Sequence, residues 1–160
     1  MSLVYGIESG GPSVILTDDA IASMAHHRQM TAKDREAGGQ LFARFEGTST
    51  IIVEATEPKP LDKRSRYGFS PNQWLQRLEI KFLHKRGKHF VGDWHTHPQP
   101  VPSPSNEDIN NMVDCFRKSR HELRAFLMVI VGTAEPPEGL YVCLVDGNGV
   151  SRLALAINVL

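Results

Sequence analysis

The sequence predicts a mixed α/β (α+β) fold, a mixed β-sheet with helices packed on both faces. Three observations support this prediction: apolar runs of strand length, stretches with helical apolar periodicity, and turn signals that join neighbouring strands into hairpins. Helices that alternate with both hairpins and isolated strands favour a sheet with helices packed on it. At 160 residues the chain is long enough for a single domain, residues 1–160, with a sizeable core.

Composition excludes several classes of protein. Lys and Arg together number 18, as do Asp and Glu, so the formal net charge is zero and no nucleic-acid partner is expected. No apolar run approaches the roughly 18 residues that span a bilayer, so no membrane partner is expected. Cys115 and Cys143 form no CxxC pair, which favours a cytoplasmic enzyme over a disulfide-linked scaffold.

The first half of the chain contains a strand, a helix and a hairpin. Thr17 or Asp18 can cap the helix, and Glu46-Gly47 supplies the hairpin turn. The expected ranges are a strand at 13–16, a helix from 17 or 18 to about 30, a polar link at 31–35, and strands at 36–45 and 50–55.

A segment rich in Pro, Lys and Arg follows, and residues 58–69 are expected to form a mobile loop. Ser70 is the expected N-cap of the next helix, with Pro71 at its first position and Gly87 at its end. The apolar stripe of this helix is expected to comprise Trp74, Leu75, Leu78 and Phe82, with Trp74 in the core.

The second half of the chain supplies a strand, a proline-rich loop, a helix and further strands. Three prolines within residues 98–104 exclude regular structure there. Ala125 to Val131 is a continuous apolar run, typical of a buried central strand. The expected ranges are strands at 89–97, 125–131, 140–145 and 150–157, a helix at about 105–120, and a hairpin turn at 146–149.

The segment that carries chemistry runs from the end of the strand at 89–97 into the next helix. His95 and His97 are two residues apart on a strand, so both imidazoles point to the same side. Asp108, at the start of the helix, can add a carboxylate oxygen as a third ligand. Three protein ligands and one open position are the arrangement of a catalytic zinc. Ser105 shares a helix face with Asp108, and its hydroxyl can donate to a developing oxyanion.

Each part of this pattern also has a simpler interpretation. Ser105-x-x-Asp108 resembles a capping box, and a lone His-x-His pair is compatible with surface or half-buried histidines. Other metal motifs fit worse: His-Glu-x-x-His and Pro-Cys-x-x-Cys are absent, no Asp-His pair follows His-x-His, and the helices argue against a cupin barrel. The joint occurrence of both histidines, the proline, the serine and the aspartate favours metal.

The motif His95-Thr96-His97-Pro98, six residues, Ser105, two residues, Asp108 resembles the JAMM motif of JAB/MPN+ metallopeptidases, without gap or substitution. Glu36, before a glycine pair, fits the place of that family's upstream glutamate. The resemblance implies the JAB/MPN (cytidine-deaminase-like) fold and one Zn²⁺ per chain held by His95, His97 and Asp108. It further implies that Glu36 is the general base and that Ser105 steadies the tetrahedral intermediate.

The resemblance also implies a substrate. Members of this family cleave isopeptide or peptide bonds after ubiquitin-like C-termini, and residues 92–105 look similar to bacterial JAB proteins of CBASS antiphage operons. There the peptidase removes the C-terminus of a nucleotidyltransferase from its target. A zinc peptidase or amidase acting on another peptide, and a non-catalytic MPN scaffold, remain alternatives. The residues expected to select the substrate are Lys63, Arg64, Arg66 and Gln99.

Overall fold

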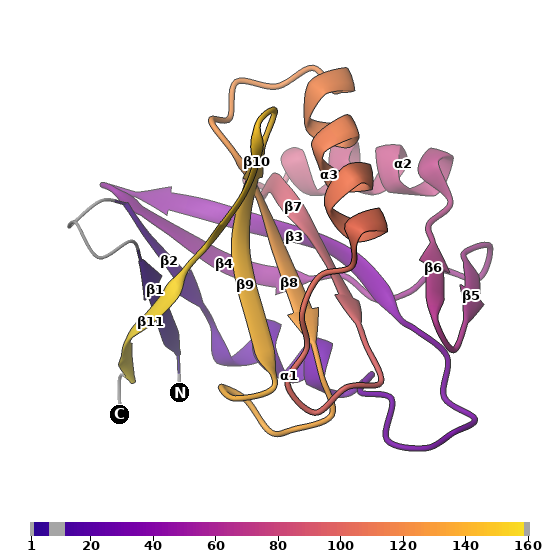
Figure 1. The fold of residues 1–160 in the computed structure, drawn as a ribbon. Helices are drawn as coiled ribbons and strands as arrows, with labels where there is room; N and C mark the ends of the chain where they lie inside the picture. The colour runs from indigo at the N-terminus through magenta and orange to yellow at the C-terminus, as the bar shows by residue number, and fades with distance from the viewer. Residues whose placement is uncertain (1, 7–11, 159–160) are drawn as a thin grey trace.

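The computed structural model describes residues 2–6 and 12–158 (Figure 1). In chain order its elements are β1 (Leu3–Gly6), β2 (Ser13–Leu16), α1 (Asp18–Ala25), β3 (Gly38–Glu46), β4 (Ser49–Ala55), β5 (Lys63–Ser65), β6 (Gly68–Ser70), α2 (Gln73–His84), β7 (His89–Thr96), α3 (Asn106–Lys118), β8 (Phe126–Val131), β9 (Leu140–Asp146), β10 (Gly149–Arg152) and β11 (Ala154–Asn158). No helix in these ranges is long and apolar enough to cross a membrane.

A mixed sheet forms the centre of the molecule. Among the described residues nine strands join it, in the order β10-β9-β8-β7-β3-β4-β2-β1-β11. The pairs β7–β8 and β2–β4 are parallel, and the remaining pairs are antiparallel. The strand that leads into the histidine pair, β7, therefore lies inside the sheet, between β3 and β8. Its backbone is held on both sides by hydrogen bonds.

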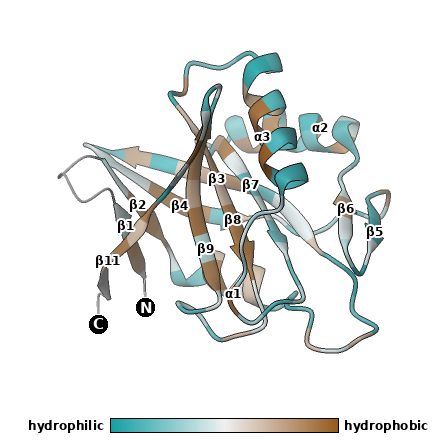
Figure 2. Cartoon of the chain, in the orientation of Figure 1, coloured by the Kyte–Doolittle hydropathy of each residue, from teal (hydrophilic) through white to brown (hydrophobic). Residues whose placement is uncertain are grey.

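Helices pack on both faces of this sheet, as predicted. All six residues of β8 are buried, and they alternate between two cores. Leu127, Val129 and Val131 face the core that includes Ala20 and Met24 of α1. The intervening residues of β8 face a second core that α3 covers. The apolar residues concentrate on β8 and β9, between the helices (Figure 2).

Several sequence-predicted elements are confirmed closely. The strand at 13–16 is β2, the hairpin is β3–β4, and the continuous apolar run is β8. Thr17 caps α1 by accepting a hydrogen bond from the Ala20 N–H. However, α1 ends at Ala25 rather than near Met30. Beyond it the backbone tightens into short turns, and the Arg28 side chain donates to the Ala25 carbonyl.

The prediction of a mobile loop at 58–69 is wrong, because the hairpin β5–β6 occupies residues 63–70. The start of α2 also differs from the prediction. Asn72, not Ser70, is the N-cap and accepts a hydrogen bond from the Leu75 N–H. The Asp62 carboxylate accepts hydrogen bonds from the N–H groups of Lys59 and Asn72. It therefore connects the segment before the hairpin to the start of α2.

The predicted apolar stripe of α2 is wrong by one residue. Trp74, Leu78 and Phe82 are 65%, 44% and 55% exposed, so Trp74 is not in the core. The helix turns Glu79 and Leu83 inward instead. Glu79 accepts hydrogen bonds from the Thr56 hydroxyl at 2.7 Å and the Lys59 ammonium at 3.0 Å. Because the inward face of α2 includes the charged Glu79, apolar periodicity does not identify that face as the buried one.

The single strand expected at 150–157 is two strands. β10 pairs with β9, whereas β11 pairs with β1 at the opposite edge of the sheet. Leu153, between them, is buried and donates its N–H to the Val142 carbonyl. β1 itself was not anticipated from the sequence.

Gly92 of β7 lies so close to the backbone of β8 that its substitution tests the packing of these two strands. A Cβ at this position would lie 1.8 Å from the Leu127 carbonyl oxygen of β8, which is fixed by the strand pairing. We expect Gly92→Ala to lower the free energy of unfolding by about 3 kcal/mol or more, measured by urea denaturation. Gly6→Ala is the matched strand control, because a Cβ there meets no atom of the described residues within 4 Å. Equal effects of both substitutions would contradict this account of the β7–β8 contact.

Candidate metal centre

The histidine pair lies where β7 ends. Strand alternation turns His95 and His97 to the side of the sheet that α3 covers, while Thr96 between them points to the other side. Thr96 is fully buried, and its hydroxyl accepts the Ala37 N–H and donates to Gln29 Oε1, both at 2.9 Å. The middle residue of the His-x-His motif thus anchors the strand end that carries the two imidazoles.

The carboxylate comes from the first turn of α3. Ser105 is the N-cap: its hydroxyl oxygen accepts the Asp108 N–H at 3.0 Å, and the Ser105 N–H donates to Asp108 Oδ2 at 2.9 Å. The capping box is therefore real. The same Oδ2 also faces both imidazoles, so the capping and metal-ligand interpretations of this sequence are compatible. The backbone N–H of Ser105 orients the carboxylate towards the histidines.

Three donor atoms converge at this point. His95 Nε2 and His97 Nε2 are 3.2 Å apart, and Asp108 Oδ2 lies 3.3 Å and 3.1 Å from them, respectively. Tetrahedral zinc with bonds of about 2.0–2.1 Å separates its ligand atoms by about 3.3–3.4 Å. These three residues are the group of metal-ligating side chains that the described part of the chain brings within 4.8 Å. The donor set therefore fits a divalent metal ion of zinc's size and preference.

Glu36 is brought to this cluster from a distant part of the sequence. It lies just before β3, and only 6% of its surface is exposed. Its backbone is held by the β5–β6 hairpin: the Glu36 N–H donates to the Ser65 carbonyl, and Arg64 Nε donates to the Glu36 carbonyl, both at 2.7 Å. The next residue, Ala37, pairs with Thr96. The acid is thus fixed relative to the end of β7.

Electrostatics couple Glu36 to the cluster. Burial raises the pKa of Glu36 to about 7, with His97 opposing and Asp108 adding to this shift. Burial lowers the pKa of His97, but the hydrogen bond and charge of Asp108, with Glu36 and Gln99, outweigh it, so the net change is upward. Burial alone raises the pKa of Asp108, but hydrogen bonds from His95, His97 and Ser105 hold it well below its usual range.

The glycine pair beside Glu36 has a steric cause. A Cβ on Gly39 would lie 1.9 Å from the Thr56 carbonyl oxygen and 2.8 Å from Trp94 Nε1. The buried Trp94 indole donates to that same Thr56 carbonyl at 2.9 Å. The strand that follows Glu36 therefore passes close to both backbone and indole. Trp94 belongs to the core that α1 covers, on the far side of β7 from the histidines.

The predicted substrate-selecting residues lie in different surroundings. Arg64 contacts the Glu36 backbone, but Lys63 is exposed, and Arg66 donates to the Thr31 carbonyl and the Tyr67 hydroxyl. Gln99 contacts His97 and accepts a hydrogen bond from the Ser103 N–H, so it helps to shape the loop between the histidines and α3.

Sequence reasoning missed Gln29, which is 3% exposed and also donates to the Asp34 and Arg66 carbonyls. A lone glutamine after a helix gave no signal of this role.

Comparison with known proteins finds a matching family model and several similar proteins. The family model described as prokaryotic homologs of the JAB domain matches residues 17–143. A protein named CD-NTase/cGAS isopeptidase from Pseudomonas aeruginosa is 35% identical over 132 residues, covering 81% of this chain and 80% of that protein. A protein of the same name from Enterobacter hormaechei is 30% identical, covering 87% and 77%. A Desulfitobacterium hafniense protein with a solution structure has a TM-score of 0.61 at 27% identity, covering 86% and 87%.

The donor geometry predicts that the purified protein binds one Zn²⁺ per chain. We expect His97→Ala and Asp108→Ala to abolish stoichiometric zinc, measured by inductively coupled plasma mass spectrometry after dialysis, because each removes one converging donor. His84→Ala, on the exposed side of α2, is the histidine control and should retain zinc. Zinc retention by both ligand variants would place the metal elsewhere.

The raised pKa of Glu36 makes a prediction about stability. Between about pH 4.5 and 7 the folded metal-free chain holds a proton on Glu36 that the unfolded chain has released. The free energy of unfolding therefore falls as pH rises through this window. Glu36→Gln removes the contribution of Glu36 to this dependence, so in chelated protein we expect it to raise the free energy of unfolding by about 1–3 kcal/mol at pH 8 and by little at pH 4.5. Urea denaturation at both pH values measures it, and a loss at pH 8 would contradict the prediction.

Proposed function

The chain belongs to the family of prokaryotic homologs of the JAB domain, and we propose that it is a zinc-dependent isopeptidase that releases a conjugated protein C-terminus. The observation that carries this proposal is the convergence of His95, His97 and Asp108 beside the buried Glu36. Two relatives described above are named CD-NTase/cGAS isopeptidases, which supports a JAB-type isopeptidase role. We further propose that the chain acts in CBASS-type antiphage defence, the role that the resemblance of residues 92–105 implies.

His95, His97 and Asp108 would hold the zinc ion, which when bound supplies Lewis-acid polarisation of the scissile carbonyl and a water of lowered pKa. The chain's own contribution is the position of its acid and its donors. Glu36 is desolvated, and desolvation disfavours a charged carboxylate and makes it a stronger base. Its carboxylate accepts the proton of the attacking water and, as a carboxylic acid, returns that proton to the leaving amine.

Ser105 assists at the oxygen of the attacked carbonyl. Its hydroxyl oxygen already accepts the Asp108 N–H, which fixes the side chain but leaves its own proton free to donate. A donor fixed before reaction costs no reorganisation when negative charge develops. Ser105 and Asp108 are joined by the capping box, so this donor is held beside the ligand set.

The substrate in this proposal is a protein C-terminus joined through an amide bond to an amine of a target. Such a tail is extended, and an extended segment can add to an exposed strand edge near the site by backbone hydrogen bonds. The names of the relatives make a CD-NTase the first conjugate to test. Cleavage would separate the two proteins, leaving a free carboxylate on the conjugated C-terminus and a free amine on the target.

Glu36→Gln is expected to reduce cleavage of a CD-NTase conjugate by about 10²–10⁴-fold while leaving zinc content and the far-ultraviolet circular dichroism spectrum intact. Gel-based cleavage of the conjugate by zinc-loaded protein, with and without chelator, measures this. Glu46→Gln is the matched control, since Glu46 is exposed at the far end of β3. Unchanged turnover in Glu36→Gln, or full activity in chelator, would remove the basis of the proposed chemistry.

A further inference from the structure

We propose that Arg35 and Arg64 form a receptor for the carboxylate of an acidic side chain, Asp or Glu, close to the scissile bond of the conjugate. This inference rests on the proposed function, because it takes the ligand to be part of a polypeptide substrate. It assigns recognition to a particular hollow beside Glu36 rather than to the basic segment as a whole.

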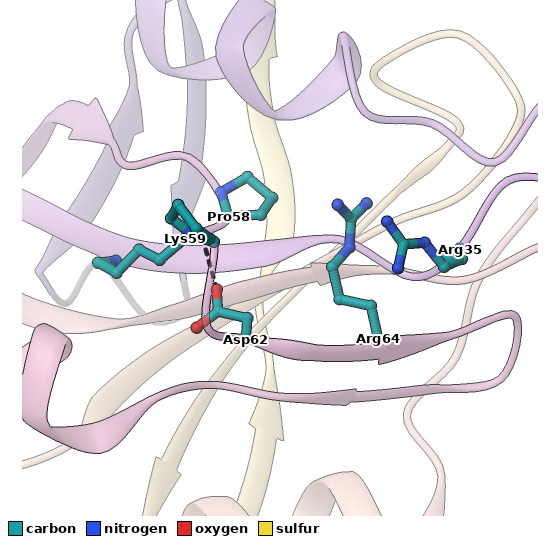
Figure 3. A pocket seen from close by; sticks show the side chains of 6 residues that line it. Arg35, Pro58, Lys59, Asp62 and Arg64 are labelled. Carbon is teal, nitrogen blue, oxygen red and sulfur yellow. Dashed lines mark hydrogen bonds between the residues drawn. The ribbon is translucent and has the colours of Figure 1, made fainter.

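A hollow of about 240 Å³ lies beside the segment that carries Glu36. Arg35, Pro58, Lys59, Pro60, Asp62 and Arg64 line it (Figure 3). Figure 3 shows the Arg64 guanidinium rising from β5 and that of Arg35 directed towards it. Both arginines adjoin the proposed base: Arg35 precedes Glu36 in the chain, and Arg64 donates through Nε to the Glu36 carbonyl.

The other charged groups of the hollow are already engaged. Lys59 extends away from the two guanidinium groups and donates to Glu79 Oε1 at 3.0 Å. The Asp62 carboxylate accepts two backbone N–H groups, from Lys59 at 2.6 Å and from Asn72 at 2.8 Å. Asp62 thus forms part of the wall, and Figure 3 shows its carboxylate turned towards Lys59 rather than towards the two guanidinium groups.

The two arginines retain unused donors. Among the residues that the structure describes, Arg64 makes one side-chain hydrogen bond, from Nε to the Glu36 carbonyl, so its terminal nitrogens remain available. Arg35 is exposed and makes no hydrogen bond or ion pair within residues 2–6 and 12–158. Burial lowers the pKa of Arg64, and the charge of Arg35 lowers it further, with Asp62 opposing. An anion between the two groups would relieve their mutual repulsion.

The chemistry favours a carboxylate as that anion. A guanidinium presents parallel N–H donors in a plane that matches the two oxygens of a carboxylate. Asp and Glu are the side chains through which an ordinary polypeptide brings this group. An extended chain advances about 3.3 Å per residue, so the hollow lies within reach of residues a few positions from the bond that Glu36 addresses.

Binding to inactive protein tests the inference separately from catalysis. The background is Glu36→Gln, and the probe is a fluorescently labelled CD-NTase conjugate, measured by anisotropy. Adding Arg35→Glu is expected to weaken binding by about 10–100-fold, the effect of losing a charge-assisted contact. Arg44→Glu, an exposed arginine on β3, is the control for net charge. Arg64 is left intact because its substitution would also release the Glu36 carbonyl.

The complementary substrates locate the partner. Each acidic residue of the conjugate within about six positions of the scissile bond is changed to Lys in turn. One such change should weaken binding to the Glu36→Gln protein that retains Arg35. Adding Arg35→Glu to that protein should restore the binding of the same changed conjugate. Equal affinities of the Arg35→Glu and Arg44→Glu proteins, or no detectable binding of the conjugate, would overturn the inference. Arg35-dependent binding without cleavage by the zinc-loaded wild-type chain would overturn the proposed function and leave the carboxylate receptor standing.

Discussion

The site depends on one contact between distant segments, the pairing of Ala37 with Thr96. The Thr96 N–H donates to the Ala37 carbonyl at 2.8 Å, and the Ala37 N–H donates to the Thr96 hydroxyl. Because Thr96 is flanked by the two histidines and Ala37 is preceded by Glu36, this contact sets the acid against the imidazoles. It is buried, so water does not compete for its hydrogen bonds. The glycine pair, Gln29 and the β5–β6 hairpin all serve to hold the Glu36–Ala37 segment at this place.

The parts of the site that could be predicted from spacing lie within one strand–loop–helix segment. Strand alternation alone orients His95 and His97 together, and the helix start places Asp108 a short loop away. Glu36 is different, because its partner segment is 59 residues distant in sequence, between Ala37 and Thr96. No periodicity reports such a pairing. The glutamate entered the prediction only through resemblance to a family, and the close approach that requires Gly39 is visible only in the folded chain.

Two errors in the fold prediction, the stripe of α2 and the loop expected in place of β5–β6, share a physical cause. Apolar periodicity finds a buried face when burial is apolar, as in β8 and on α3. On α2 the inward face includes Glu79, which is stabilised by Thr56 and Lys59 from outside the helix. The hairpin at 63–70 is short and highly charged. It is stabilised by tertiary contacts such as that of Arg64 with Glu36, rather than by burial of an apolar face. Long-range polar contacts decided both elements, and local sequence does not encode them.

Asp108 shows why fold and site cannot be separated at the start of α3. Its Oδ2 accepts the Ser105 N–H, which satisfies a backbone donor at the helix terminus, and the same atom completes the donor triangle. A carboxylate near a helix N-terminus is favoured by the helix dipole without a metal. The carboxylate is therefore oriented by folding, so a metal ion held by the proposed ligand set would need to offset less of the entropy of ordering it. The serine that caps the helix is fixed by the same box, so the hydroxyl assigned to the oxyanion inherits its position from helix capping.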